Sequence, residues 1–155
     1  MKETEKIEIM HFSQEGYIED GKNVYETGKK MIALADKVAD EGYDAIFLMG
    51  VGGTWDEFMQ LEYLMNKFGD RDLEVYLIHA AEWNVMGHKR MTEKSVVLTA
   101  SESGTTPEVL EAVKKMKGMG VRVYAMTKPE GPIGQAVGAE NCVAMASDHG
   151  SGGCE

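Results

Sequence analysis

Four hydroxyl side chains are gathered around one glycine in the middle of the chain. They belong to Ser101, Ser103, Thr105 and Thr106. Hydroxyls and backbone N–H groups both donate hydrogen bonds to phosphate oxygens, and the partial positive charge at a helix N-terminus adds to the attraction. The residue chemistry therefore predicts a phosphate-binding loop, to which Glu102 contributes its backbone N–H while its carboxylate points away.

The same residues also make a good helix start. Thr105 and Glu108 have the spacing of a capping box, and Pro107 suits the first helical turn. A cap uses only one hydroxyl, however, whereas this loop contains four. The composition therefore favours phosphate binding over capping alone.

A second loop follows an earlier apolar run. Gly52 and Gly53 would let the backbone approach a ligand, and Thr54 offers a hydroxyl at the next helix start. A tight strand–helix turn in which Thr54 acts as a cap explains the pattern equally well. A dinucleotide-binding G-x-G-x-x-G motif would need glycine where Trp55 stands, so we do not expect NAD to bind.

Strands and helices alternate along the chain, as the apolar patterning shows. A helix is expected over Lys22–Glu41, where apolar residues recur every three or four positions, and Gly42 should end it. Strand-length apolar runs follow at 45–49, 73–78, 96–100, 121–126 and, more weakly, 142–145. Such alternation predicts a parallel sheet with helices on both faces. In the strand order 2-1-3-4-5, the loops after the first and third strands would face one crevice.

Composition narrows the function further. The 155 residues suit one domain, and the net charge of −10 argues against nucleic acid and anionic membranes as partners. No apolar run is long enough to cross a membrane, and the N-terminus lacks the apolar core of a signal peptide. The two cysteines lack metal-site spacing. We expect a cytoplasmic protein with no metal and no cofactor.

Several segments together resemble the SIS (sugar isomerase) domain family. The strand at 96–100 followed by Ser-x-Ser-Gly-x-Thr resembles the family signature, and the turn at 50–54 resembles the family's Gly-x-Gly-x-Ser with threonine in place of serine. The elements at 81–83 and 126–128 also fit in order and spacing. The resemblance extends from about residue 22 to residue 155.

This resemblance implies a fold and a substrate class. The fold would be a three-layer, flavodoxin-like α/β sandwich whose five-stranded parallel sheet has the order 2-1-3-4-5. The ligand would be a phosphorylated sugar, with its phosphate held by Ser101, Ser103 and Thr106. The nearest branches contain two SIS domains and include fructosamine-6-phosphate deglycases and aldose–ketose isomerases, which move a proton between C1 and C2 without a metal or cofactor.

The resemblance also suggests catalytic residues. Glu155 matches a glutamate at the start of the family's final helix that acts as the base, and His149 lies near the predicted crevice as a second candidate. His79 ends a strand and is more often a packed residue than a catalytic one. We expect His88, beside Lys89 and Arg90, to lie in a solvated loop.

The chain organisation predicted from the sequence is an arm at 1–21 and an SIS domain at 22–155 that is truncated before its final helix. An uncovered sheet face would then favour a homodimer or higher homo-oligomer formed through helix 22–41 and segment 1–20. The alternative function is a phosphosugar-sensing domain of a regulator, although no basic helix-turn-helix segment is present.

Overall fold

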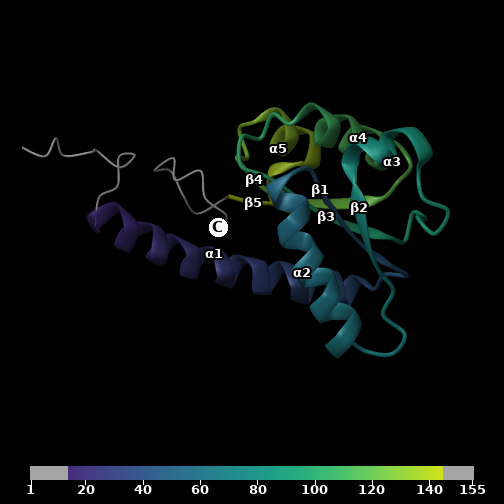
Figure 1. Cartoon of the computed structure of the whole chain (residues 1–155), viewed down its shortest axis with the longest axis horizontal. Helices are drawn as coiled ribbons and strands as arrows, with labels where there is room; N and C mark the ends of the chain where they lie inside the picture. The colour runs from purple at the N-terminus through teal and green to yellow at the C-terminus, as the bar shows by residue number, and fades with distance from the viewer. Residues whose placement is uncertain (1–13, 145–155) are drawn as a thin grey trace, which may run out of the picture.

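The computed structural model describes residues 14–144 and shows an α/β domain built on one parallel sheet (Figure 1). The strand order is β2-β1-β3-β4-β5, which confirms the predicted topology. The strands are β1 Ile46–Gly50, β2 Val75–His79, β3 Val96–Ser101, β4 Arg122–Thr127 and β5 Cys142–Val143. The helices are α1 Gln14–Glu41, α2 Gly53–Phe68, α3 Ala80–Met86, α4 Pro107–Gly118 and α5 Pro132–Val137, followed by a 3-10 turn η1 at Ala139–Asn141.

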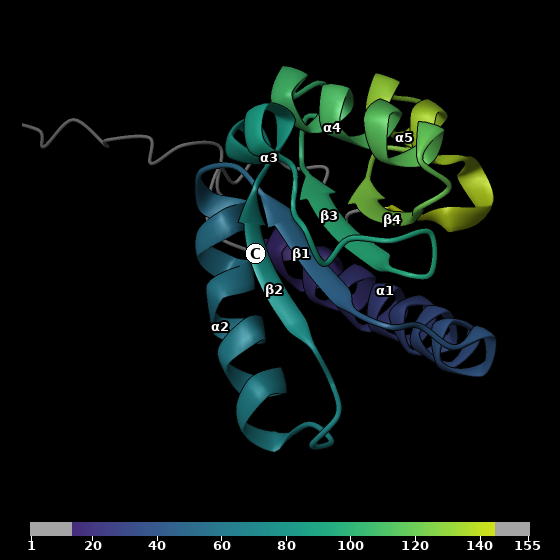
Figure 2. The same ribbon diagram turned by 90° about the vertical axis from the view of Figure 1, so that its right-hand side faces the viewer.

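Helices cover both faces of the sheet, which gives the three layers that the sequence predicts. Helices α3, α4 and α5 lie on one face, and α1 and α2 lie on the other (Figures 1 and 2). Neighbouring strand residues point to opposite faces, so Phe47 packs toward α4 while Leu48 packs toward α2. Both side chains are fully buried. The continuous apolar runs in the sequence follow from this two-sided burial.

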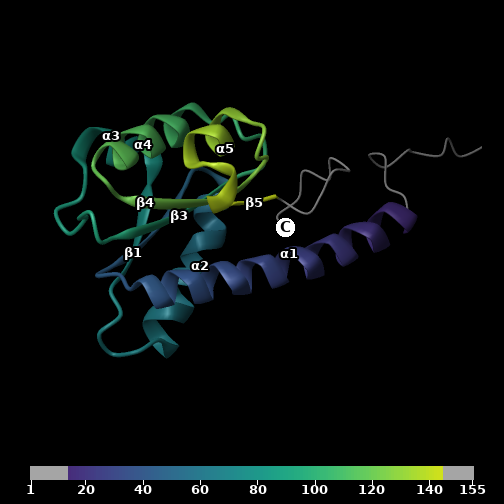
Figure 3. The same cartoon turned by 180° about the vertical axis from the view of Figure 1, so that it is seen from behind.

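Helix α1 is longer than the sequence pattern predicts. It begins at Gln14 rather than at Lys22, and it ends at Glu41 before Gly42, whose φ of +71° suits a glycine. The prediction relied on an apolar stripe that begins at Val24. The first two turns instead form without burying an apolar face, so that stripe could not reveal them. Figure 3 shows the N-terminal half of α1 extending beyond the sheet.

No helix within residues 14–144 has the length and apolar character needed to cross a membrane.

Candidate functional site

Ser101 is the last residue of β3, and the loop that follows it closes on itself before α4 begins. The hydroxyls of Ser101 and Thr106 lie 2.9 Å apart and share a hydrogen bond. The backbone N–H of Gly104 donates to the carbonyl of Ser101 at 3.2 Å. The loop is therefore a compact turn that gathers its hydroxyls at the carboxyl end of β3.

Ser103 and Thr105 form a second hydroxyl pair in the same loop. Ser103 Oγ accepts hydrogen bonds from the backbone N–H of Thr105 at 3.2 Å and from Thr105 Oγ1 at 3.1 Å. Because Ser103 Oγ acts as an acceptor in both bonds, its own hydroxyl hydrogen remains available to a ligand. Both side chains are exposed at the mouth of the loop.

The helix-cap alternative can be tested directly at the start of α4. Thr106 occupies the N-cap position, yet its side chain makes no capping hydrogen bond, and its hydroxyl pairs with Ser101 instead. The hydroxyls therefore do not satisfy the N-terminal N–H groups of α4 in the usual way. An anion held at this position would complement those groups and the helix dipole.

Two neighbouring elements hold the phosphate loop in place. Thr127 is fully buried at the end of β4, and its hydroxyl donates to the carbonyl of Ser101 at 2.7 Å. The backbone N–H of Ile133, in α5, donates to the carbonyl of Gly104 at 3.0 Å. Gly104 has φ +66°, and a Cβ there would lie 3.2 Å from Thr127 Oγ1, so both conformation and space favour glycine. The sequence spacing pointed to Thr127 only through the family resemblance and did not reveal its contact with Ser101.

The loop after β1 is a tight turn in which Thr54 serves the backbone. Thr54 Oγ1 accepts from the N–H of Val51 at 3.2 Å and donates to the carbonyl of Val51 at 3.1 Å. Its hydroxyl is thus engaged within the turn, as the strand–helix alternative proposed. Gly52 and Gly53 leave open space, because a Cβ at either position would meet no atom within 4 Å.

The two loops lie at the same edge of the sheet. β1 and β3 are adjacent parallel strands, with Met49 opposite Thr99, and Thr99 Oγ1 donates to the carbonyl of Met49 at 2.9 Å. The chain winds outward in opposite directions from this pair, so the carboxyl ends of β1 and β3 flank the topological switch point. Open α/β sheets bind ligands at such points.

His79 also lies at this edge. It ends β2 opposite Gly50, and its ring contacts the Trp55 ring edge-on at a centroid distance of 6.4 Å. The ring is only partly buried. This packing against Trp55 supports the interpretation of His79 as a strand-end residue.

His88 does not lie in a solvated loop, so that prediction was wrong. Its ring packs against Phe47 at 5.1 Å and against Tyr76 at 4.8 Å between centroids. Burial, together with the charges of Lys89 and Arg90, holds the pKa of His88 below its usual value. The neighbouring charges suggested solvation, whereas the aromatic surface of the sheet draws the imidazole inward.

The remaining predicted site residues fall elsewhere. Glu155 and His149 lie outside the described residues 14–144, and their roles stay predictions. Within the described part of the chain, no group of three or more His, Cys, Asp or Glu side chains is arranged to hold a metal ion.

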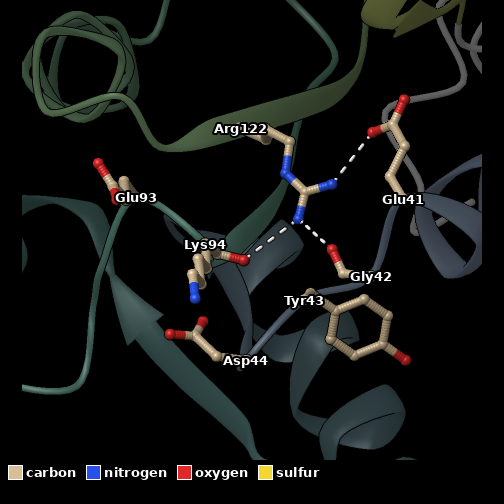
Figure 4. A pocket seen from close by; sticks show the side chains of 7 residues that line it. All are labelled: Glu41, Gly42, Tyr43, Asp44, Glu93, Lys94 and Arg122. Atoms are coloured by element: carbon tan, nitrogen blue, oxygen red, sulfur yellow. Dashed lines mark hydrogen bonds and ion pairs between the residues drawn. The ribbon is translucent and has the colours of Figure 1, made fainter.

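A cavity of about 550 Å³ lies at the opposite edge of the sheet, where Arg122 is the central side chain (Figure 4). Its guanidinium donates to Glu41 at 3.0 Å and also to the carbonyls of Gly42 and Lys94. Nearby, Asp44 accepts from the hydroxyl of Ser95 at 2.9 Å. Arg122 thus fastens the end of α1 to the sheet, which accounts for its position without a ligand.

Comparisons with known proteins agree with this geometry, although no protein-family model matches the chain. Fructosamine deglycase FrlB of Bacillus subtilis (strain 168) is 28% identical over 108 residues, which cover 69% of this chain and 33% of that protein. Glutamine–fructose-6-phosphate aminotransferase (isomerizing) of Pyrococcus horikoshii is 25% identical over 138 residues, or 88% of this chain and 23% of that protein. The chain therefore spans about a third or less of these curated relatives.

A solved structure shows the same fold. E. coli CFT073 c3406, solved in complex with a phosphosugar, superposes with a TM-score of 0.63 at 16% identity, over 88% of this chain and 77% of that one. The sheet order, the hydroxyl loop after β3 and the sequence relatives all lead to the same assignment. The chain belongs to the SIS (sugar isomerase) domain family.

Proposed function

We propose that this domain binds a phosphorylated sugar, with the phosphate on the loop from Ser101 to Thr106. The observation that carries the proposal is the N-terminus of α4, whose N-cap residue Thr106 makes no side-chain cap and whose neighbouring hydroxyls are grouped beside it. The backbone N–H groups and the hydroxyls of Ser103 and Thr105 would donate to the phosphate oxygens. The fold neighbour solved with a bound phosphosugar supports a ligand of this class.

The sugar would extend from this loop toward the turn after β1. Gly52 and Gly53 leave room for it, since neither position has an atom within 4 Å of where a Cβ would stand. Thr54 would shape the turn through its bonds to Val51 rather than reach the ligand with its hydroxyl. The phosphate would thus act as the anchor, and the turn would line the path of the carbon chain.

We further propose that the domain serves an enzyme that moves a proton between C1 and C2 of the sugar, as a sugar-phosphate isomerase or a fructosamine-6-phosphate deglycase. Both curated relatives are enzymes, which favours catalysis over a phosphosugar-sensing role. Glu155 is the proposed base, with His149 as a second acid–base group. A fixed phosphate would hold C1 and C2 in one position relative to that base, which is the main contribution of this domain to the reaction.

Calorimetric titration with fructose 6-phosphate tests the phosphate assignment. We expect Ser103→Ala to weaken binding about tenfold or more, because one charge-assisted hydrogen bond contributes about 1.5–3 kcal/mol. Ser103→Thr keeps the hydroxyl and should retain most of the affinity. Fructose without phosphate should bind far more weakly to the unchanged protein. Equal affinity of Ser103→Ala and the unchanged protein would show that the phosphate binds elsewhere.

A further inference from the structure

The protruding half of α1 carries an apolar stripe that nothing among the described residues covers. Ile18, Tyr25 and Ile32 are spaced seven residues apart, and their exposed fractions are 52%, 66% and 65%. A seven-residue spacing keeps them on one side of a helix, as in helices that pair along their length. Val38, farther along the helix, is buried against the sheet, so the exposed stripe is a separate surface from the one that anchors α1.

Small residues alternate with the large ones along this stripe. Gly21, Gly28 and Ala35 each follow a large residue by three positions. Ala35 is exposed, and a Cβ at Gly21 or Gly28 would meet no atom within 4 Å. The stripe therefore presents a regular series of projections and notches, which we call the α1 seam (Ile18, Gly21, Tyr25, Gly28, Ile32 and Ala35).

We propose that the α1 seam pairs with the α1 seam of a second copy of this chain in an antiparallel arrangement. The register that sets Tyr25 opposite the partner's Gly21 also sets Ile18 opposite the partner's Gly28. Both of these large side chains then face a notch, because an antiparallel pair places the two sets of heptad positions opposite each other. A parallel pair would instead place Tyr25 against the partner's Tyr25 and glycine against glycine.

Charge supports the same orientation. Glu15 and Lys29 occupy equivalent heptad positions beside the seam, and both are exposed. The antiparallel register brings Glu15 near the partner's Lys29, and symmetry repeats that contact. Lys29 already pairs with Glu26 of its own helix at 2.8 Å, and an ammonium group has donors to spare for a second carboxylate. A parallel pair would place like charges side by side at both positions.

Sedimentation of the 155-residue chain from ~1 μM to ~1 mM tests the proposal, because a reversible dimer dissociates on dilution. We expect a dimer whose dissociation constant rises tenfold or more in Gly28→Leu. Leucine is apolar and favours the helix, so this variant would strengthen a nonspecific apolar contact but fill a notch in the proposed one. Asn23→Leu, on the opposite side of α1, is the matched control and should leave the dimer unchanged.

The orientation has its own test. Glu15→Lys and Lys29→Glu should each weaken the dimer roughly three- to tenfold, since exposed ion pairs contribute modestly and each occurs twice. The double variant Glu15→Lys/Lys29→Glu should restore the original affinity. Lys30→Glu makes the same charge change one residue along and should have little effect. A monomer at every concentration, or a dimer that ignores Gly28→Leu and the charge exchange, would overturn the proposal.

Discussion

At the scale of single residues, two buried threonines make similar hydrogen bonds with different consequences. Thr99 donates to Met49 at 2.9 Å in the middle of the sheet, and Thr127 donates to Ser101 at 2.7 Å beneath the phosphate loop. Both hydroxyls join neighbouring strands, but only the second holds a carbonyl that belongs to the proposed site. Comparing the two separates general stability from control of the loop.

Replacing either threonine by valine should destabilise the fold by about 1–3 kcal/mol, because a buried carbonyl loses its partner. Urea unfolding measures that cost. Thr127→Val should in addition weaken binding of fructose 6-phosphate several-fold, whereas Thr99→Val should leave affinity close to that of the unchanged protein. If the two variants lost affinity equally, Thr127 would have no special part in positioning the loop.

His88 should make the stability of the protein depend on pH. Its burial beside Phe47 and Tyr76 lowers its pKa, so the unfolded chain takes up the proton more readily than the folded one. The contribution of neutral His88 is present above the ordinary histidine pKa of about 6.5 and is lost as the pH falls through the lowered value.

His88→Phe keeps an aromatic ring and removes the titration. The stability difference between wild type and this variant should therefore shift against wild type as the pH is lowered from ~7.5 to ~5.5, as measured by urea unfolding. The other histidines are common to both proteins and cancel in the comparison. A difference that does not change with pH would mean that His88 titrates normally.

At the scale of elements, the strands were the most predictable part of the fold. Their apolar runs are continuous because both faces are covered, and the predicted run at 96–100 differs from β3 only by the addition of Ser101. The order of the strands followed from the loops that had to share a crevice. The family resemblance then gave the same order independently.

The short helices were harder to predict. α3 has seven residues and α5 has six, too few for an apolar stripe to repeat. For α5, Pro132 at its start and Gly138 after its end are signals that could have revealed it. No comparable start signal precedes α3, which follows β2 without a loop.

The predicted site shows the same division. The hydroxyls around Gly104 could be recognised because residue type alone indicates phosphate chemistry. The role of Thr127 depends on a contact between residues 26 positions apart, which spacing cannot show. The ambiguity at Thr54 was resolved only by the geometry of its bonds to Val51.

At the scale of the whole molecule, a net charge of −10 works against an anionic substrate. The proposed loop answers this with short-range groups, namely oriented N–H dipoles and hydroxyls, which act over a few ångströms. The molecule's overall field is screened by salt over ~8–10 Å, so it affects the approach of the sugar phosphate more than its final binding.

Catalysis should depend on residues beyond this loop. In the intact protein, Glu155→Gln should keep binding of fructose 6-phosphate but lower exchange of its C1 protons with deuterated water by roughly 10²–10⁴-fold, because the amide cannot act as the base. NMR of the sugar phosphate follows that exchange. Exchange at the unchanged rate would assign the base to another residue, and His149→Gln would then be the next variant to measure.

The way α1 is anchored has a consequence for how the protein is made. Val38 docks on Val96 and Tyr124, which belong to β3 and β4. A ribosome synthesises α1 before any strand of the sheet, so this docking surface does not exist until most of the described chain has left the exit tunnel. During that interval the apolar sides of α1 face chaperones and the nascent chains of neighbouring ribosomes, so the first helix to be made is among the last to be fixed in place.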